Sequence, residues 1–261
     1  MDWYDVNLAV EKALTAGWML DFRTKLPRHE TRRFQERKSP NDILGVCSHQ
    51  SGSQNQDIMR TAKYHIGPNH VSSEGCPGLL YSLVISQEFP GKVLLANDFR
   101  LITWSQGAGG EHVGDENRHL LSLLVMGDFY EDSPCRSGGA PTCDQIRMWK
   151  KATTWLRNLF GFDGHGYFGH HHFGKGTCPG KSLRQLIECR RMDYPGLEDA
   201  AAWQSALLRW DPSCLPKYGA DGFWGEESRQ ALVRFEKAYR HKVDGLRDPF
   251  TELLLLKKYS K

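Results

Sequence analysis

The chain carries the stretch Ile43-Leu44-Gly45-Val46-Cys47-Ser48-His49, in which an apolar run ends in a serine and a histidine. An uninterrupted apolar run of this length is typical of a strand that is buried on both faces of a sheet. The stretch therefore predicts a buried strand whose C-terminal end presents His49. Further strand-like segments, separated by turn signals, follow at 79–85, 92–96, 101–104 and 120–126.

Helical patterns surround these segments. The clearest begins at Thr142, a candidate N-cap that forms a capping box with Gln145, and ends at Gly161. Apolar residues recur every three to four positions between these ends, as an amphipathic helix requires. Shorter helices are expected at 5–16, 55–66 and 182–191. Strands that alternate with helices predict an α/β fold built around a sheet.

The character of the sequence changes after Pro195-Gly196, where three short helical patterns follow at 199–210, 226–239 and 249–258. Asp221-Gly222 precedes the second pattern and Asp244-Gly245 the third, which makes a pseudo-repeat with a spacing of 23 residues. Such a repeat is too short for a solenoid. We therefore expect a boundary near 192–198 and three parts of the chain: an N-terminal helix and arm at 1–39, an α/β domain at 40–191 and a three-helix domain at 198–261.

The charge and the apolar pattern exclude several classes of protein. The 261 residues include 34 Lys and Arg against 31 Asp and Glu, a net charge of +3. This is too close to balance for a nucleic-acid binder that works by bulk charge. Apolar runs are too short to span a membrane, and Met1–Asp5 lacks the basic and apolar regions of a secretory signal. The charged segment 28–38 has no periodicity and is expected to be a surface arm or linker.

Seven cysteines are scattered along the chain. Because the number is odd, at least one must be free, bind a metal or pair outside the chain. Cys47 is expected in the core. Cys135 and Cys143 flank a glycine-rich loop and could pair in an oxidising compartment, and the sequence leaves that pairing open.

A second glycine-rich segment points to a metal. His170 and Cys178 are eight positions apart, and a loop of this length can turn both toward one ion. With His49 they offer two imidazoles and one thiolate, which leaves the fourth tetrahedral position of zinc to water, as in catalytic sites. His171 and His172 are then expected to face the substrate or to support the ligands.

The same residues allow two other interpretations. A structural zinc would need a fourth protein ligand, for which His171 or His172 is the candidate. In the second alternative there is no metal: His49 is a hydrogen-bonded core histidine and Cys178 is an inert buried thiol.

The order of these motifs resembles that of the zinc-dependent N-acetylmuramoyl-L-alanine amidases, the type that phage endolysins share with peptidoglycan recognition proteins. Gly169-His170 followed by Cys178-Pro179-Gly180 is similar to the closing motif of the family, and His49 to its strand-end zinc histidine. The resemblance covers roughly residues 40–185. It implies a central mixed sheet flanked by helices and one Zn²⁺ held by His49, His170 and Cys178.

The resemblance also suggests catalytic side chains. Leu79–Ile85 is similar to the family strand that carries an active-site tyrosine, which is Tyr81 in this chain. Phage relatives have a lysine two residues before the cysteine, whereas this chain has Gly176 there and Lys175 one position earlier. Some relatives have a glutamate near the metal where this chain has Leu124. Tyr81 and Lys175 are thus the implied catalytic residues, and the proton acceptor is left open.

The C-terminal pattern is similar to the peptidoglycan-binding module of many cell-wall hydrolases. The resemblance rests on Trp203-Gln204, Leu207, Asp221-Gly222, Gly225, Ala231, Phe235, Asp244-Gly245, Thr251 and Leu254. It implies that residues 198–261 bind the wall, with Trp224 as a candidate contact to the glycan.

Together the two resemblances imply hydrolysis of the amide between N-acetylmuramic acid and L-alanine by a zinc-bound water. The expected partner is bacterial peptidoglycan, with no nucleic acid and no membrane span, and the chain is expected to be a monomer. The lack of a signal favours a bacteriolytic, antimicrobial phage endolysin over a secreted autolysin. It would stay in the host cytoplasm until a holin-type protein releases it to the cell wall.

Two alternatives of other classes remain. One is a non-catalytic protein that recognises peptidoglycan, although such relatives lack the metal-binding cysteine that this chain has at Cys178. The other is a muramidase, which would need paired carboxylates such as Glu111 and Asp115. The preferred stem peptide is not predicted by either resemblance.

Overall fold

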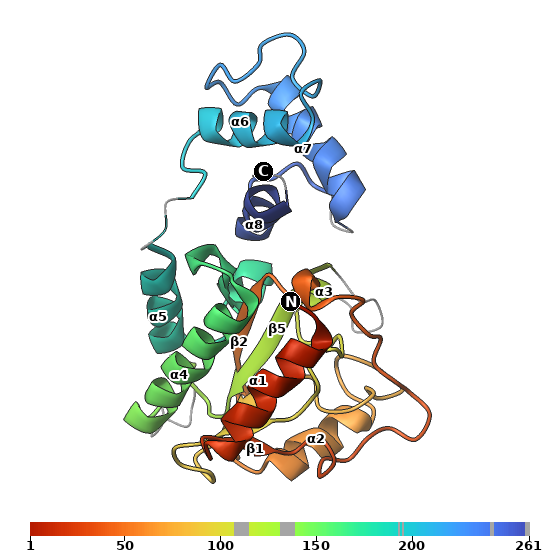
Figure 1. The fold of residues 1–261 in the computed structure, drawn as a ribbon, viewed down its shortest axis with the longest axis vertical. Coiled ribbons are helices and arrows are strands. Elements are labelled where there is room, and N and C mark those ends of the chain that lie inside the picture. The colour runs from red at the N-terminus through yellow and green to blue at the C-terminus, as the bar shows by residue number, and fades with distance from the viewer. Residues whose placement is uncertain (107–114, 131–138, 193, 195, 241–242, 259–261) are drawn as a thin grey trace. The chain divides into compact units, whose positions relative to one another are not determined.

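The computed structural model describes residues 1–106, 115–130, 139–192, 194, 196–240 and 243–258. The chain divides into two compact units, residues 1–190 and 191–261 (Figure 1). Within the described ranges, no helix combines the length and the apolar character needed to cross a bilayer. Cys135 and Glu111 lie outside the described residues, as does the side chain of Asp115, so the proposed disulfide and carboxylate pair are not described either.

A mixed sheet forms the centre of the first unit. In the described residues it has six strands, in the order β1-β4-β3-β5-β2-β6. Neighbouring strands are parallel except β3 and β4, which are antiparallel. The mixed sheet expected from the sequence is confirmed. The strands are β1 (Met19–Asp21), β2 (Gly45–Gln50), β3 (Leu83–Ile85), β4 (Val93–Leu95), β5 (Leu120–Val125) and β6 (Tyr167–Gly169).

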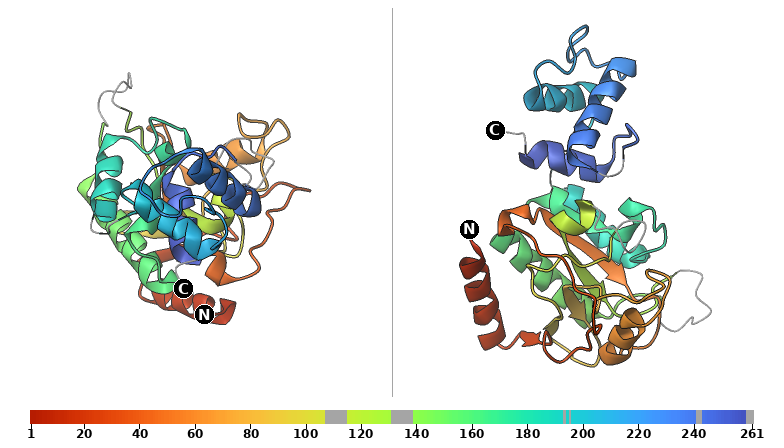
Figure 2. Two further views of the ribbon diagram at one scale, coloured as in Figure 1. Left: turned by 90° about the horizontal axis from the view of Figure 1, so that it is seen from above. Right: turned by 90° about the vertical axis from the view of Figure 1, so that its right-hand side faces the viewer.

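Helices cover both faces of this sheet. On one face, apolar residues of α1 (Trp3–Thr15), α4 (Cys143–Phe160) and α5 (Lys181–Met192) share a cluster with Leu121 and Leu123 of β5. On the other face, α2 (Ile58–Ile66) packs against Leu124, and Figure 2 shows α1 and α2 on opposite sides of the sheet. All six residues of β5 are buried, because both faces of this central strand are covered. The unit also contains α3 (Asp115–His119) and the 3₁₀ turns η1 (Pro40–Asp42), η2 (Gly164–Gly166) and η3 (His170–Phe173).

Helix α4 has the ends that its sequence predicts. The hydroxyl of Thr142 accepts the backbone N–H of Gln145, and the Gln145 side chain accepts the backbone N–H of Thr142. Gly161 ends the helix with a φ of 69°, in the left-handed region that favours glycine. The indole N–H of Trp149 donates to the hydroxyl of Ser48 at 2.9 Å. This hydrogen bond fixes α4 against β2, directly beside His49.

Two strand predictions are too long, and two short strands were not predicted. Of residues 79–85, only Leu83–Ile85 pair in the sheet, so Tyr81 precedes β3 instead of lying in it. In 101–104, only Leu101 forms an isolated bridge, with Glu36. The edge strands β1 and β6 have three residues each, which is too short to produce a recognisable pattern.

Segment 28–38 is largely at the surface, as expected of an arm, but Arg37 is buried with only 2% of its surface exposed. Its guanidinium donates five hydrogen bonds of 2.5 to 2.9 Å to main-chain carbonyls, those of Phe99, Leu101, Asn117, Arg118 and Leu120. A single charged side chain therefore ties this segment to the start of β5. Sequence patterns could not show this, because the five carbonyls come from distant parts of the chain.

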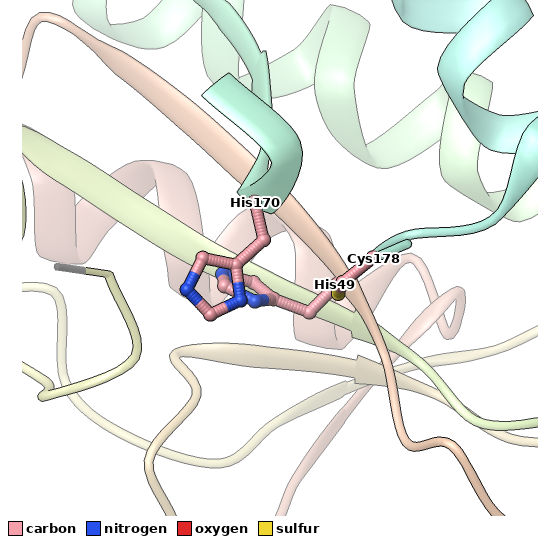
Figure 3. A group of neighbouring side chains, drawn as sticks. All are labelled: His49, His170 and Cys178. Atoms are coloured by element: carbon pink, nitrogen blue, oxygen red, sulfur yellow. The ribbon is translucent and has the colours of Figure 1, made fainter. Parts of the chain in front are cut away.

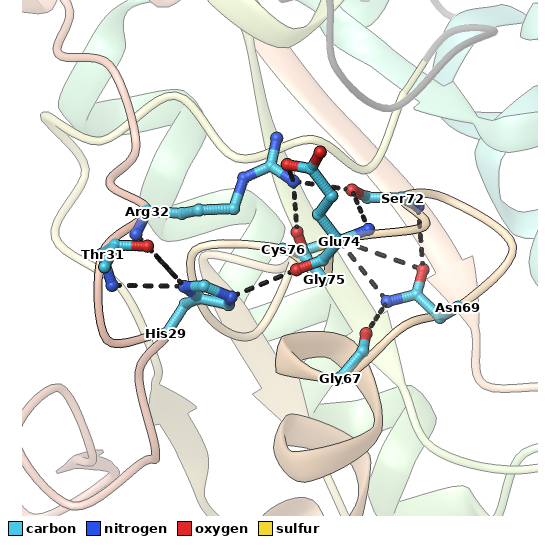
Figure 4. Close-up of polar contacts among 9 residues, drawn as sticks. All are labelled: His29, Thr31, Arg32, Gly67, Asn69, Ser72, Glu74, Gly75 and Cys76. Carbon is cyan, nitrogen blue, oxygen red and sulfur yellow. Dashed lines mark hydrogen bonds and ion pairs between the residues drawn. The ribbon is translucent and has the colours of Figure 1, made fainter.

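The segment before Arg37 also supports the loop that follows α2 (Figure 4). Arg32 donates to the hydroxyl of Ser72 at 2.8 Å and to the carbonyl of Gly75 at 2.9 Å. A ring nitrogen of His29 lies 3.1 Å from the carbonyl of Glu74. Gly75 has a φ of +82°, and a Cβ at this position would lie 2.0 Å from the carbonyl oxygen of Ile66. Loop 67–76 is therefore held on both sides, by the arm and by the end of α2.

The second unit contains α6 (Ala200–Trp210), α7 (Glu226–Tyr239) and α8 (Pro249–Lys258). A buried polar side chain holds each of its two Asp-Gly turns. Gln204 accepts the N–H of Gly222 at 2.8 Å, and Glu236 accepts the N–H of Gly245 at 2.8 Å. The pseudo-repeat in the sequence thus corresponds to two turns that are capped in the same way.

Candidate metal centre and its cleft

Neighbouring parallel strands bring two of the predicted ligands together. Ser48 of β2 pairs with Gly169 of β6, so His49 is the next residue of β2 and His170 is the first residue after β6. Their ring centroids are 4.5 Å apart. Cys178 lies in the loop before α5, and its Sγ accepts the backbone N–H of Gln50 at 3.4 Å. Ligand atoms of His49, His170 and Cys178 all lie within 4.8 Å of one another (Figure 3).

The surroundings of these three side chains suit a metal ion. Nε2 of His49 and Nε2 of His170 are both buried and have no hydrogen-bond partner among the described residues. A buried polar atom without a partner costs about 1–3 kcal/mol, so a native structure rarely keeps two side by side unless something binds them. Two imidazoles and one thiolate are ligands that zinc prefers. The residues present therefore fit a tetrahedral ion such as zinc.

Burial controls the protonation of the three candidate ligands. It lowers the pKa of His49 well below its ordinary value and that of His170 to about 4, so both imidazoles are neutral at pH 7. Burial also raises the pKa of the Cys178 thiol to about 11. A dication beside the sulfur would oppose that rise, because it stabilises the thiolate. Neutral imidazoles and a metal-stabilised thiolate are the forms in which these side chains bind zinc.

The segment after His170 is a 3₁₀ turn, and this changes the interpretation of the next two histidines. His171 and His172 both point to Glu188 on α5, with Nε2 to Oε1 distances of 3.3 and 3.2 Å. Neither residue lines the cleft at His49. Among the described residues, the group of His49, His170 and Cys178 gains no fourth His, Cys, Asp or Glu ligand. This arrangement gives no support to the alternative of a structural zinc closed by His171 or His172.

The three candidate ligands lie at a cleft of about 700 Å³ that Tyr81 and Lys175 also line. The ring of Tyr81 lies 5.2 Å from that of His49 between centroids. Burial raises the pKa of the Tyr81 phenol, so its hydroxyl keeps its proton and can donate a hydrogen bond. Lys175 is exposed, in the glycine-rich turn that ends at Cys178. Leu124 lines the cleft as well.

Helix α2 and the loop after it supply cleft residues that the sequence analysis missed, namely Arg60, Thr61, Tyr64, His65 and His70. The spacing of 60, 61, 64 and 65 places these side chains on one face of the helix, which is the signal that could have identified them. His65 contacts both the segment before β3 and the ring of Tyr81. It is buried, its Nδ1 accepts the backbone N–H of Leu80 at 3.4 Å, and its ring lies 5.8 Å from that of Tyr81.

Among the residues that the structure describes, the charged side chains that line this cleft are all positive. Arg60 and Lys175 are the cations that line it, and no Asp or Glu is among its lining residues. A ligand with carboxylate groups is therefore favoured over a cationic one.

Trp224, the candidate glycan contact, lies in the second unit and is half-buried. Its ring packs 6.2 Å from that of Trp203, and the guanidinium of Arg247 lies 4.8 Å from its centroid. The nearby hollow of about 390 Å³ is lined by Tyr218 and Phe223 and not by Trp224. Phe223 is 74% exposed and Tyr218 57% exposed. The structure thus places two other aromatic rings where a ligand of this unit would have access.

Comparisons with known proteins show the fold of the first unit. No family model and no curated protein matches this chain. The solved structure of peptidoglycan recognition protein-LE in complex with tracheal cytotoxin matches with a TM-score of 0.50 and 14% identity, over 66% of this chain and 93% of that one.

Two further solved structures are similar at 14% identity and a TM-score of 0.47. The N-acetylmuramoyl-L-alanine amidase LysC from Clostridium intestinale URNW matches over 68% of this chain and 98% of its own. Peptidoglycan Recognition Protein-1 from Manduca sexta matches over 66% and 89%. The mixed sheet flanked by helices is therefore the fold of peptidoglycan recognition protein-LE.

Proposed function

We propose that this protein is a zinc-dependent hydrolase that cleaves the amide between N-acetylmuramic acid and L-alanine in peptidoglycan. The observation that carries the proposal is the convergence of His49, His170 and Cys178, without a fourth protein ligand among the described residues, in an accessible cleft. Three protein ligands and one open position are the arrangement of catalytic zinc sites, whereas structural sites are closed.

A zinc ion in this site would polarise the scissile carbonyl and lower the pKa of water to about 7. The protein would add hydrogen-bond donors to that chemistry. Tyr81 is the first donor, because its phenol stays protonated beside His49. Lys175 lies on an exposed turn that lines the cleft, and its ammonium group can add a positive charge to that of the zinc ion. Donors aimed at an oxygen that becomes negative stabilise the transition state.

His65 would act as a donor and not as a base. Because its Nδ1 accepts the N–H of Leu80, the neutral ring carries its proton on Nε2. Burial and the neighbouring His70 lower the pKa of His65 to about 4, so the ring is neutral at pH 7. A neutral imidazole with its proton on Nε2 can donate a hydrogen bond to a substrate carbonyl but cannot accept a proton there. The proton acceptor of the reaction must therefore be sought elsewhere.

The second unit would hold the enzyme on its insoluble substrate. Tyr218 and Phe223 expose large aromatic faces beside a hollow, and such faces stack on sugar rings. Wall binding raises the local concentration of substrate without contact to the scissile bond. The role as a phage endolysin that acts as a monomer and is released from the host cytoplasm stays a prediction from the sequence.

The test is the release of new L-alanine amino termini from purified peptidoglycan. We expect release by the zinc-loaded protein, loss of release after treatment with a chelator, and recovery when zinc is restored. New reducing sugar ends would instead indicate a muramidase. Binding to peptidoglycan without either product would support the alternative of a non-catalytic recognition protein.

A further inference from the structure

A second group of metal-binding side chains lies beside the first and takes no part in the proposed reaction. It consists of His171 and His172 on η3 and Glu188 on α5. Nε2 of His171 lies 3.3 Å from Oε1 of Glu188, and Nε2 of His172 lies 3.2 Å from the same oxygen. The two imidazole centroids are 4.0 Å apart. Two histidines and one carboxylate form a common ligand set for zinc and similar divalent ions.

The distances are compatible with a shared ion. A charged N–H···O⁻ hydrogen bond is typically about 2.7–2.9 Å long, which is shorter than both contacts. In a tetrahedral site with bonds of about 2.0–2.1 Å, neighbouring ligand atoms are roughly 3.3–3.4 Å apart. The separations of 3.2 and 3.3 Å from Glu188 are close to that edge length.

The backbone holds His172 in an orientation suited to a ligand. Nδ1 of His172 lies 3.2 Å from both the N–H and the carbonyl oxygen of Gly169. The N–H of Gly169 can only donate, so without an ion Nδ1 accepts it and Nε2 carries the proton toward Glu188. Binding of an ion requires the other tautomer, in which Nδ1 donates to the carbonyl of Gly169 and Nε2 offers its lone pair. A backbone carbonyl on the distal nitrogen is the usual support of a histidine that binds a metal.

We propose that His171, His172 and Glu188 form a second site for a divalent transition-metal ion of the zinc class, distinct from the site at His49, His170 and Cys178. The ion would clamp η3 to α5 and so fix the turn that begins at His170. Arg184, one helical turn before Glu188, places a positive charge near His171. The second ion is therefore expected to bind more weakly than the first.

Cobalt titration of the full-length, metal-free protein distinguishes the two sites. Co²⁺ bound by a thiolate gives an intense sulfur-to-metal charge-transfer band in the near ultraviolet, whereas a site of two imidazoles and a carboxylate gives only weak visible bands. We expect two equivalents of Co²⁺ to bind. The first should produce the charge-transfer band, and the second should add visible absorption without increasing it.

Three variants assign the second ion to its residues. Glu188→Gln should reduce the stoichiometry from two to one and keep the charge-transfer band, which also shows that the variant is folded. Glu11→Gln, which removes an exposed carboxylate from α1 of the same unit, is the matched control and should still bind two. Cys178→Ser should lose the band but keep the second ion.

Binding of one equivalent by the wild-type protein would overturn the proposal, and so would two equivalents in Glu188→Gln. If two equivalents bind and neither produces a charge-transfer band, the site at Cys178 and hence the proposed function are contradicted. The proposed second site at Glu188 would still stand.

Discussion

Replacement of Tyr81 by Phe tests whether its hydroxyl takes part in catalysis. The change removes one oxygen and keeps the ring, whose centroid lies 5.2 Å from that of His49 and 5.8 Å from that of His65. Because burial raises the pKa of this phenol, the hydroxyl carries its proton throughout the working pH range and is a permanent donor. Loss of one such donor to a developing oxyanion lowers kcat by about 10²–10³, or roughly 2.7–4 kcal/mol.

The assay is the initial rate of L-alanine amino-terminus release from a soluble muropeptide, with zinc content and thermal unfolding measured on the same preparation. We expect kcat to fall by about two to three orders of magnitude while KM, zinc content and Tm change little. A loss that appears mainly in KM would mean that Tyr81 positions the substrate. Wild-type kcat and KM would refute the role of Tyr81, and the reaction would then depend on other donors such as His65 and Lys175.

Three further predictions follow from the structure. Deletion of residues 196–261 should weaken co-sedimentation with intact sacculi but leave hydrolysis of soluble muropeptide; loss of bound zinc from the remaining chain would show instead that the two units fold cooperatively. Arg37→Met should reduce the free energy of unfolding by on the order of 4 kcal/mol, because five buried carbonyls lose their donor, and unchanged stability in urea would contradict this. The pKa of His65 is lowered to about 4, so the unfolded chain binds this proton before the folded chain does on acidification. His65 should therefore contribute roughly 3 kcal/mol of the stability that the metal-free protein loses between about pH 6.5 and 4, beside the contributions of His49 and His170, and His65→Gln should reduce that pH dependence by its share in urea titrations.

The sequence could predict features that depend on residues close together in the chain. The capping box of Thr142 and Gln145 and the glycine after α4 need only local hydrogen bonds, and both are as expected. His49, His170 and Cys178 could be singled out because each ends or follows a short, recognisable segment. Their approach to within 4.8 Å depends on the pairing of β2 with β6, and the short strand β6 has no pattern of its own.

The features that were missed depend on distant parts of the chain. Arg37 looked like part of a solvated charge run, because its five carbonyl partners lie 62 to 83 residues away. Within the helix expected at 55–66, no local pattern marks His65, and only its contacts with Leu80 and Tyr81 show that it faces the cleft. His171 and His172 were expected to face the substrate or to support the ligands, and the 3₁₀ turn directs both to Glu188 on α5.

The proposed function requires one zinc ion that is held by two imidazoles and one thiolate with a fourth position open to solvent. Zinc-edge X-ray absorption on protein loaded with one equivalent of Zn²⁺ measures this directly. We expect one sulfur at about 2.3 Å and three nitrogen or oxygen neighbours at about 2.0–2.1 Å, with the sulfur absent in Cys178→Ser. A first shell without sulfur in the wild-type protein would contradict it.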